Sequence, residues 1–240
     1  MFVLWLALPA DRAAKREPAP GNDAPLALFT SLPLYWTESE DIGELLDDSS
    51  QLHWARRALE RQEVLHPLDY LATGNLEQYG ALLVAQPRAL SPEENVALDN
   101  WVRSGGRLLL FTDPLLTAES RFGLGDPRRP ADVGLLSPIL ARWGLELTFD
   151  PDQPEGVRTA EVLGEQMPVE MAGKLVDFPV PPGATSECRL LADGLAADCT
   201  IGAGGALVIA DAALLDRDAP DQEQRGEILL HLLNHSYGIE

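Results

Sequence analysis

The sequence has little cysteine and little lysine. Its two cysteines, Cys188 and Cys199, are too few to enclose a zinc ion, and they are too far apart for a C-x-x-C motif. Lys15 and Lys174 are the only lysines, and 38 acidic residues outweigh 18 basic ones, which gives a formal net charge of −20. This charge disfavours nucleic acid and anionic lipid as partners, because both are bound through Lys and Arg.

Motifs of nucleotide binding and of serine hydrolases are also missing. The chain has no G-x-x-x-x-G-K-[ST] loop and no G-x-S-x-G elbow. The stretch "GAGG" at 202–205 precedes a strand pattern rather than a helix, so we interpret it as a hairpin turn. We expect no cofactor.

Groups of possible metal ligands are weak. Glu227, His231 and His235 recur at every fourth position and share a helix face, which favours either a metal site or a solvated, helix-capping role. Besides the two histidines, no third strong metal ligand is evident elsewhere in the sequence. We therefore prefer the solvated or capping role and expect no metal. His53 and His66 are isolated. An acidic run lacks the spacing of a calcium loop and is interpreted as a solvated face: Glu38, Glu40, Asp41, Glu44, Asp47 and Asp48.

The chain has no long hydrophobic run. Its N-terminal stretch "MFVLWLALPA", residues 1–10, is well short of the ~20 apolar residues that span a bilayer. Arg12, Lys15 and Arg16 follow this stretch, whereas a signal peptide carries its charges first. We expect either the end of a membrane helix that begins upstream or a short interfacial anchor, and prefer the former. Residues 11–25 then form a linker, and residues 26–240 form one α/β domain.

From residue 26 onward, strand and helix patterns alternate. Helices are predicted at 52–62, with Ser49 or Ser50 as N-cap, and at 91–106, where Ser91 and Glu94 form a capping box. This order predicts an open parallel sheet between helices, and hairpin patterns in residues 155–210 predict an antiparallel extension at one edge. The strand patterns cover residues 26–32, 63–68, 81–87, 107–112 and 206–211.

The two cysteines flank a predicted turn at Asp193-Gly194. They are equally distant from this turn, so a two-residue hairpin would place them opposite each other. Two interpretations remain open. The cysteines form a cross-strand disulfide, which fits an oxidising compartment, or they are two small buried thiols.

The ends of the predicted strands would meet at one edge of the sheet, where α/β proteins place their ligands. Asp113 and Asp211 would be neighbours, either as an acid–base pair with split pKa values or as residues that cap the following turns. We prefer the capping role. The candidate binding crevice comprises Ser31, Tyr35, Trp36, Gln86, Thr112 and Asp113.

Four segments in this order resemble the auxiliary domain of GldG-type ABC transport systems and related bacterial membrane-anchored proteins of unknown function. They are "LFTSLPLYW", "YGALLVAQPRALSPEENVALDNWVRSGGRLLLFTDP", "GAGGALVIADAALL" and "RGEILLHLLNHSYG". The resemblance implies a class I glutamine-amidotransferase-like fold, which is a flavodoxin-like sandwich. Active amidotransferases carry a nucleophilic cysteine in a G-x-C-x-G elbow. Here Thr112 or Asp113 stands at that position, Pro114 follows, and no His-x-Glu pair is found near the C-terminus.

The chain is therefore expected to be a non-catalytic ligand- or protein-binding domain of a membrane-associated bacterial system. The resemblance implies ABC transporter subunits as partners and a position on the periplasmic side of the inner membrane. Tyr35 and Trp36 offer stacking area for a small sugar or a peptide. One alternative is a hydrolase that uses Asp113 and Asp211, with or without a divalent cation. Another is a structural subunit contacted through the final helix.

Overall fold

The computed structural model covers the whole chain and describes residues 25–36, 38 and 52–238. Within these residues, no helix combines the length and the apolar character needed to cross a bilayer. The predicted anchor at 1–10, nearly all of the predicted linker, the alternative N-caps Ser49 and Ser50, and the acidic run after Glu38 lie outside the described residues.

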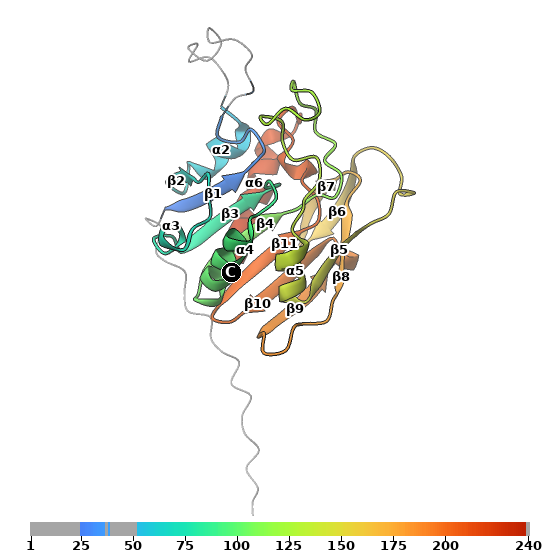
Figure 1. Cartoon of the computed structure of the whole chain (residues 1–240). Helices are drawn as coiled ribbons and strands as arrows, with labels where there is room; N and C mark the ends of the chain where they lie inside the picture. The colour runs from blue at the N-terminus through green and yellow to red at the C-terminus, as the bar shows by residue number, and fades with distance from the viewer. Residues whose placement is uncertain (1–24, 37, 39–51, 239–240) are drawn as a thin grey trace, which may run out of the picture.

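The centre of the molecule is an open sheet with the strand order β2-β1-β3-β4-β11-β10-β9 (Figure 1). The first five strands in this order run parallel to one another. β10 then pairs antiparallel with β11, and β9 pairs antiparallel with β10. The predicted α/β architecture with a mostly parallel sheet is confirmed. The strands are β1 (Leu26–Thr30), β2 (Leu65–Pro67), β3 (Ala81–Ala85), β4 (Arg107–Phe111), β9 (Ser186–Leu191), β10 (Ala196–Ile201) and β11 (Gly204–Ile209).

Each face of the sheet has its own apolar core. Successive side chains of a strand point to opposite faces, so Leu26 and Leu28 join one core, whereas Ala27 and Phe29 join the other. Helices α2 (Trp54–Leu59) and α6 (Gln222–Tyr237) cover the first face. Helices α3 (Thr73–Leu76), α4 (Pro92–Arg103) and α5 (Ser137–Trp143) cover the second. The result is three layers, with the central strands β1, β3, β4 and β11 buried between helices.

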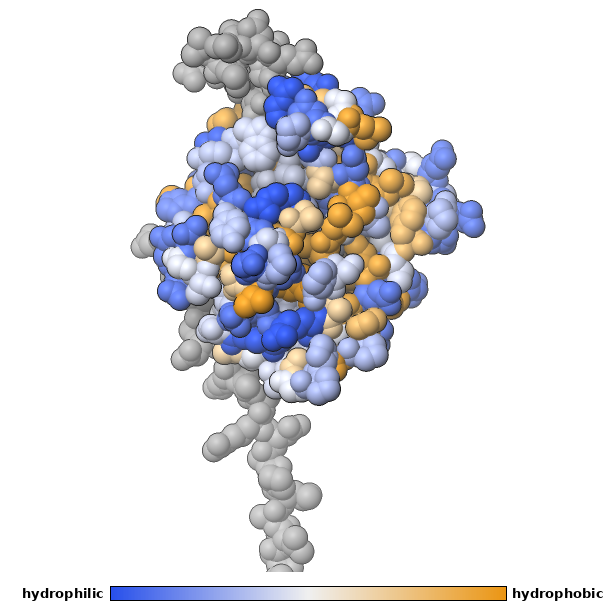
Figure 2. Space-filling model, viewed as in Figure 1, coloured by the Kyte–Doolittle hydropathy of each residue, from blue (hydrophilic) through white to orange (hydrophobic). Residues whose placement is uncertain are grey.

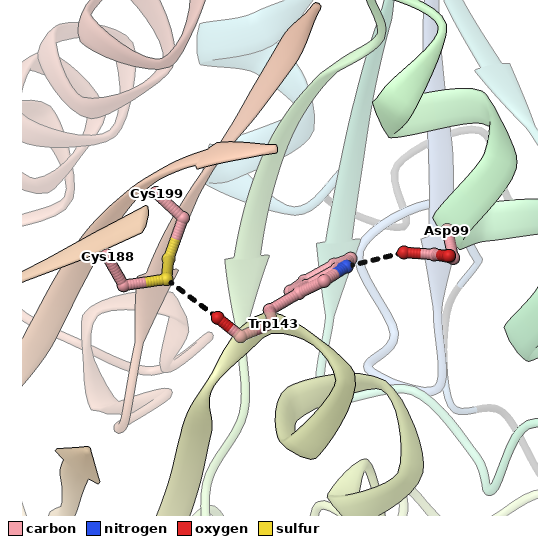
Figure 3. Close-up of a disulfide and its surroundings, with 4 residues drawn as sticks. All are labelled: Asp99, Trp143, Cys188 and Cys199. Atoms are coloured by element: carbon pink, nitrogen blue, oxygen red, sulfur yellow. Dashed lines mark hydrogen bonds between the residues drawn. A yellow bond between two sulfur atoms is a disulfide. The ribbon is translucent and has the colours of Figure 1, made fainter. Parts of the chain in front are cut away.

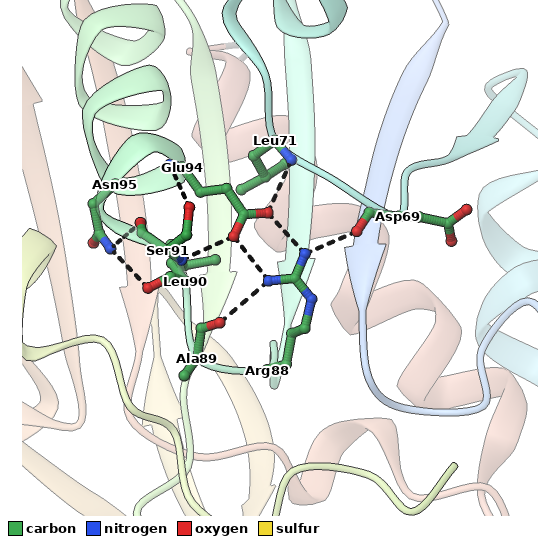
Figure 4. Close-up of polar contacts among 8 residues, drawn as sticks. All are labelled: Asp69, Leu71, Arg88, Ala89, Leu90, Ser91, Glu94 and Asn95. Carbon is green, nitrogen blue, oxygen red and sulfur yellow. Dashed lines mark hydrogen bonds and ion pairs between the residues drawn. The ribbon is translucent and has the colours of Figure 1, made fainter. Parts of the chain in front are cut away.

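The start of α4 carries the predicted capping box. The Ser91 hydroxyl accepts a hydrogen bond from the Glu94 amide, and the Glu94 carboxylate accepts one from the Ser91 amide. The same carboxylate also binds the Leu71 amide at 3.2 Å and both terminal nitrogens of Arg88 at 2.8 Å (Figure 4). Arg88 in turn donates to the carbonyl of Asp69. The buried Glu94 therefore joins the start of α4 to the chain before α3.

The N-cap of α2 differs from the prediction. The helix begins at Trp54, and the Nδ1 atom of His53 accepts a hydrogen bond from the Ala55 amide at 3.1 Å. His53 is buried, and its ring lies beside that of Trp54. The imidazole nitrogen thus takes the role that the sequence suggested for a serine.

The predicted antiparallel extension is correct for only part of residues 155–210. The β9–β10 hairpin does extend the main sheet. By contrast, β6 (Arg158–Val162) pairs with β7 (Glu165–Val169), and β8 (Gly173–Asp177) pairs with β5 (Leu145–Phe149), in two separate sheets. The β5–β8 pair depends on close packing at Gly173, where a Cβ atom would lie 2.6 Å from a Leu147 methyl carbon. This long-range contact has no local sequence signal.

The "GAGG" stretch forms the predicted hairpin turn. Gly202 and Ala203 connect β10 to β11, and Ile201 pairs with Gly204. A Cβ atom at Gly204 would lie 2.0 Å from the carbonyl oxygen of Val102, so the turn packs directly on the end of α4. Glycine is required here by this close approach.

The two cysteines form a disulfide, and the predicted register is confirmed, because Cys188 pairs with Cys199 across β9 and β10. The predicted two-residue turn is wrong. The strands are joined by a longer connection that contains a short 3₁₀ turn at Ala192–Gly194, with Ala192 and Asp193 at φ values of 48° and 54°. The connection is symmetric about the predicted turn, which is why the cysteines still align.

The disulfide lies against α5. The Sγ atom of Cys188 is 3.4 Å from the carbonyl oxygen of Trp143, and the Trp143 indole donates a hydrogen bond to Asp99 of α4 at 3.0 Å (Figure 3). A disulfide sulfur has no proton to donate, so the first contact is one of packing. Through Trp143, the β9–β10 hairpin is connected to the second helical layer.

Candidate functional site

Asp113 and Asp211 follow two adjacent strands, β4 and β11, and both are almost completely buried. Each makes a tight turn with its own chain. Asp113 Oδ1 accepts a hydrogen bond from the Leu115 amide at 2.8 Å, and Asp211 Oδ1 accepts one from the Ala213 amide at 2.7 Å. Asp side chains favour such turns because they bind the amide two residues further on.

The second oxygen of each carboxylate binds a different segment. Asp113 Oδ2 accepts a hydrogen bond from the Ala212 amide at 3.1 Å, and Asp211 Oδ2 accepts one from the Glu170 amide at 2.9 Å. All four carboxylate oxygens therefore bind backbone N–H groups. The pair holds the ends of β4 and β11 together and attaches the chain that follows β7.

The same burial changes how both carboxyl groups titrate. Burial raises the pKa of Asp113 to about 6, although the hydrogen bonds from Leu115 and Ala212 oppose the change. Burial, reinforced by the charge of Asp113, raises the pKa of Asp211 well above its usual value. Both groups thus take up a proton more readily than an exposed aspartate.

Residues of the long loop after β4 cover these strand ends. The Gln86 side chain accepts a hydrogen bond from the Asp113 amide at 2.7 Å and donates to the Asp113 and Ala131 carbonyls at 3.1 and 2.9 Å. Ser31 Oγ accepts a hydrogen bond from the Ala131 amide at 2.8 Å and donates to the Gln86 carbonyl. Gln86 itself has a left-handed backbone, with φ of 42°.

Thr112 lies beneath the same loop. It is completely buried, and within the described part of the chain its hydroxyl has no hydrogen-bond partner. Gly134 packs on it so closely that a Cβ atom there would lie 2.3 Å from Thr112 Oγ1. The Gly134 amide also donates to the Asp113 carbonyl at 2.7 Å. We call the segment 131–134 the covering segment, because it lies over Ser31, Gln86, Thr112 and Asp113.

The two aromatic candidates have different surroundings. The Arg56 guanidinium lies 4.1 Å from the centre of the Tyr35 ring and donates a hydrogen bond to the Tyr35 carbonyl. Trp36 is 44% exposed. Four of the six predicted crevice residues therefore lie together under the covering segment. The other two do not: the Tyr35 ring packs against Arg56, and Trp36 is exposed.

The turn after β4 is not a nucleophile elbow. Such an elbow is a strained strand-to-helix turn. Among the described residues, neither Thr112 nor Asp113 has a positive φ, and a long loop rather than a helix follows them before α5. The turn therefore lacks the backbone geometry of an elbow.

The histidines of α6 bind separate carboxylates. His231 Nδ1 lies 3.6 Å from Glu165 of β7, and His235 Nε2 lies 3.5 Å from Asp198 of β10. Glu227 is exposed. In the described ranges, no cluster of three or more His, Cys, Asp or Glu side chains is arranged to hold a metal ion.

Glu38 contradicts the interpretation of the acidic run as a solvated face. It is buried, and its carboxylate accepts hydrogen bonds from the Ser120 hydroxyl at 2.9 Å and the Arg121 amide at 2.8 Å. Its two partners come from the loop that follows β4. Glu38 therefore attaches the segment after β1 to that loop, and sequence alone gave no signal for this contact.

Residues 58–152 match a family model described as an ABC-type uncharacterized transport system. The resemblance to transport-system auxiliary domains is confirmed. The matched stretch runs from the end of α2 past β5, so it contains the capping box of α4 and the turn with Thr112 and Asp113. No curated protein matches the chain.

Several solved structures share the fold at low sequence identity. The chain is similar to Gan42B, a GH42 β-galactosidase from G. stearothermophilus, at 12% identity and a TM-score of 0.50, over 88% of this chain and 30% of that one. It is also similar to the exo-β-1,4-mannosidase Op5Man5 from Opitutaceae bacterium strain TAV5, at 13% identity and a TM-score of 0.50, over 88% and 36%. A third similar structure is a cold-adapted β-galactosidase from Rahnella sp. R3, at 13% identity and a TM-score of 0.50, over 91% of this chain and 32% of that one.

The chain spans about a third of the length of these glycosidases. At such identities the likeness concerns the fold alone. Within the described residues, the main sheet of this chain is open, and β2 and β9 are its two edges.

Proposed function

We propose that this chain is a non-catalytic ligand- or protein-binding domain, accessory to an ABC transporter. The family match over residues 58–152 supports the association with transport. One observation supports the proposal that the domain is non-catalytic. Every carboxylate oxygen of Asp113 and Asp211 already binds a backbone N–H. Two buried carboxylates whose oxygens all hold backbone turns are poorly placed to meet a substrate.

We assign the scaffold to the flavodoxin-like, class I glutamine-amidotransferase-like folds. The order of the five parallel strands, β2-β1-β3-β4-β11, supports this assignment. It corresponds to the 2-1-3-4-5 order of doubly wound proteins of the flavodoxin type. In this assignment, Thr112 or Asp113 takes the position of the nucleophilic cysteine of that group, and Cys188 and Cys199 form a disulfide in a hairpin.

The proposed binding surface is the rim around the covering segment, with Trp36 as its aromatic anchor. Glu38 binds Ser120 and Arg121, so the chain around Trp36 lies beside the loop after β4. That loop exposes several apolar side chains. Figure 2 shows apolar surface to the right of centre, where Figure 1 draws β6, β7 and this loop. The exposed apolar residues of the loop are Leu115, Leu124, Val133 and Leu135.

Trp36 and Leu52 provide a matched test of this surface, since both side chains are 44% exposed. The full chain, tagged and expressed in its native bacterium, is purified from solubilised membranes, and bound proteins are identified by mass spectrometry. We expect an ABC ATPase and a permease to co-purify. Trp36→Ala should reduce their recovery about tenfold or more, the effect of losing an aromatic anchor, and Leu52→Ala should not. Equal recovery with both variants would disprove the proposed surface.

The proposed location is the periplasmic side of the inner membrane. The Cys188–Cys199 disulfide supports an oxidising compartment, because cytosolic proteins rarely keep such bonds. In intact cells, both cysteines should resist alkylation by a membrane-permeant maleimide until a reductant is added. Labelling of either thiol without reduction would argue for the cytosol.

A hydrolase is the second candidate, because two neighbouring buried carboxyl groups with raised pKa values hold a proton more readily than exposed aspartates, as a general acid requires. We expect the purified chain to hydrolyse no chromogenic ester or glycoside above the blank. Hydrolysis that is abolished in both Asp113→Asn and Asp211→Asn, in variants with unchanged circular dichroism, would favour the enzyme and reject the binding domain.

A further inference from the structure

The last strand of the main sheet, β9, has an unpaired outer edge. Among the described residues, β10 is the only strand that pairs with it (Figure 1). None of its six residues is buried, whereas most of β10 is. An edge strand presents a row of free N–H and C=O groups and is a ready template for another strand.

The direction of these groups follows from the pairing with β10. Opposite residues in an antiparallel pair alternate between hydrogen-bonded and non-hydrogen-bonded positions. The Gly202 amide donates to the Thr185 carbonyl, so this pair, which continues the β9–β10 register, is hydrogen-bonded. Cys188 and Cys199, 4.0 Å apart at Cα, have the closer spacing of the other type. The groups facing β10 thus belong to Glu187, Arg189 and Leu191, and those facing outward belong to Ser186, Cys188 and Leu190.

We propose that β9 pairs with β9 of a second copy of this chain, antiparallel about a twofold axis at Cys188. In this register Cys188 faces its own equivalent, and Ser186 faces Leu190 of the second copy. All outward N–H and C=O groups of the strand then find partners, and the two sheets become one continuous sheet. Such an interface is self-complementary, as a twofold dimer requires.

The side chains select this register over its neighbours. Glu187 and Arg189 would occupy non-hydrogen-bonded positions, where facing side chains are closest. Glu187 of each copy then lies opposite Arg189 of the other. Moving the axis by one residue would place Glu187 opposite Glu187, or Arg189 opposite Arg189. Opposite charges therefore face each other only when the axis passes through Cys188.

Both charged residues are available for this contact. Glu187 is exposed, and its neighbour on β10 is the uncharged Thr200. Arg189 has a 68% exposed side chain, and its ion pair with Asp198 is long, at 3.6 Å. The arginine keeps enough freedom to bind a carboxylate of a second copy as well.

The test measures the mass of the full chain by sedimentation over a range of concentrations at physiological ionic strength. We expect wild type to form dimers. Glu187→Lys places Lys opposite Arg, and Arg189→Glu places Glu opposite Glu, so each variant alone should dimerise at least about tenfold more weakly. In an equimolar mixture every facing pair is again of opposite sign, and we expect heterodimers to form.

Glu223→Lys is the matched control, because it makes the same change of charge at an exposed position on α6. It should dimerise like wild type. Ser186→Pro removes an outward N–H at the first residue of β9, a position where proline is tolerated, and it should weaken the dimer. All variants are checked by circular dichroism.

Three results would each overturn the proposal: a wild-type chain that stays monomeric, single variants that dimerise like wild type, or a mixture that stays monomeric. If wild type is monomeric, the β9 edge would have to pair with a strand of a different protein.

Discussion

Buried carboxylates in this protein are compensated in two ways, and their pKa values diverge accordingly. Burial alone raises the pKa of Glu94, but hydrogen bonds from Arg88 and from the Ser91 and Leu71 amides outweigh it and lower the pKa to about 2. Asp113 binds backbone amides and no cation, and its pKa rises to about 6. A guanidinium contributes a full positive charge, whereas amide dipoles only partly offset lost solvation.

Glu94→Gln tests the first kind of compensation. The variant loses the charge that faces Arg88, and its NH₂ group faces a backbone amide, so we expect about 2 kcal/mol less stability at neutral pH. Because the folded pKa lies below the unfolded value near 4.5, the wild-type contribution is present above pH 4.5 and is lost as the pH falls toward 2. Urea unfolding between pH 2 and 7 should therefore show a flatter profile for the variant.

Glu60→Gln is the control for this experiment, since Glu60 forms a surface pair with Arg56 on one helix. It should cost less than about 0.5 kcal/mol. An equal loss of stability in both variants would show that the buried network around Glu94 stabilises the protein no more than a surface ion pair does.

His53 gives a second prediction at this scale. Burial, helped by the nearby Arg217 charge, lowers its pKa to about 4. Its contribution is therefore complete above pH 6.5 and is lost as the pH falls toward 4. His53→Asn keeps an N-cap acceptor for the Ala55 amide and removes the titration, so thermal unfolding should vary less with pH in this range. His53→Ala should be about 1 kcal/mol less stable than His53→Asn at every pH, because neither residue titrates and only asparagine caps the helix. Identical pH profiles for wild type and His53→Asn would contradict the prediction.

At the level of elements, the β9–β10 hairpin is the one held by a covalent cross-link, the Cys188–Cys199 disulfide. Its disulfide closes a loop with a sequence separation of 11 residues and lies against the end of α5. The hairpin forms one edge of the sheet, so constraining it also fixes the edge that we propose for dimerisation.

Replacing both cysteines, as Cys188→Ala with Cys199→Ala, should lower the free energy of unfolding by about 3 kcal/mol, the loop-entropy value for a loop of this length. Guanidinium unfolding measures this loss. Reductant should destabilise wild type by a similar amount and leave the variant unchanged. Stability that is insensitive to both changes would mean that the bond does not constrain the unfolded chain.

At the scale of the whole molecule, the described residues form two apolar cores, one on each face of the sheet. One core joins strands to α2 and α6, and the other joins them to α3, α4 and α5. The solved structures that share this fold align over 88–91% of the chain. That residues 26–240 form a single folding unit stays a prediction from the sequence.

A chain that begins at Pro25 tests this boundary. We expect one cooperative thermal transition at the midpoint of the full chain, because none of the described core residues is removed. Calorimetry of both chains makes the comparison. A lowered midpoint or a second transition would place part of the domain before residue 25.

The sequence by itself determined the parallel strands, the capping box at Ser91, the alignment of Cys188 with Cys199, and the meeting of Asp113 with Asp211. These features follow from local patterns, or from the rule that parallel strands end at one edge of a sheet. The pairing of the cysteines needed only their symmetry about one turn.

The tertiary structure alone decided that the covering segment lies over the strand ends, that β5 pairs with β8, and that Arg88 and Leu71 complete the Glu94 network. It also decided that Glu38 is buried. These contacts join segments far apart in the chain, and an irregular loop has no period to reveal what it touches. Their energies depend on burial and on partner geometry, which arise only when the layers pack together.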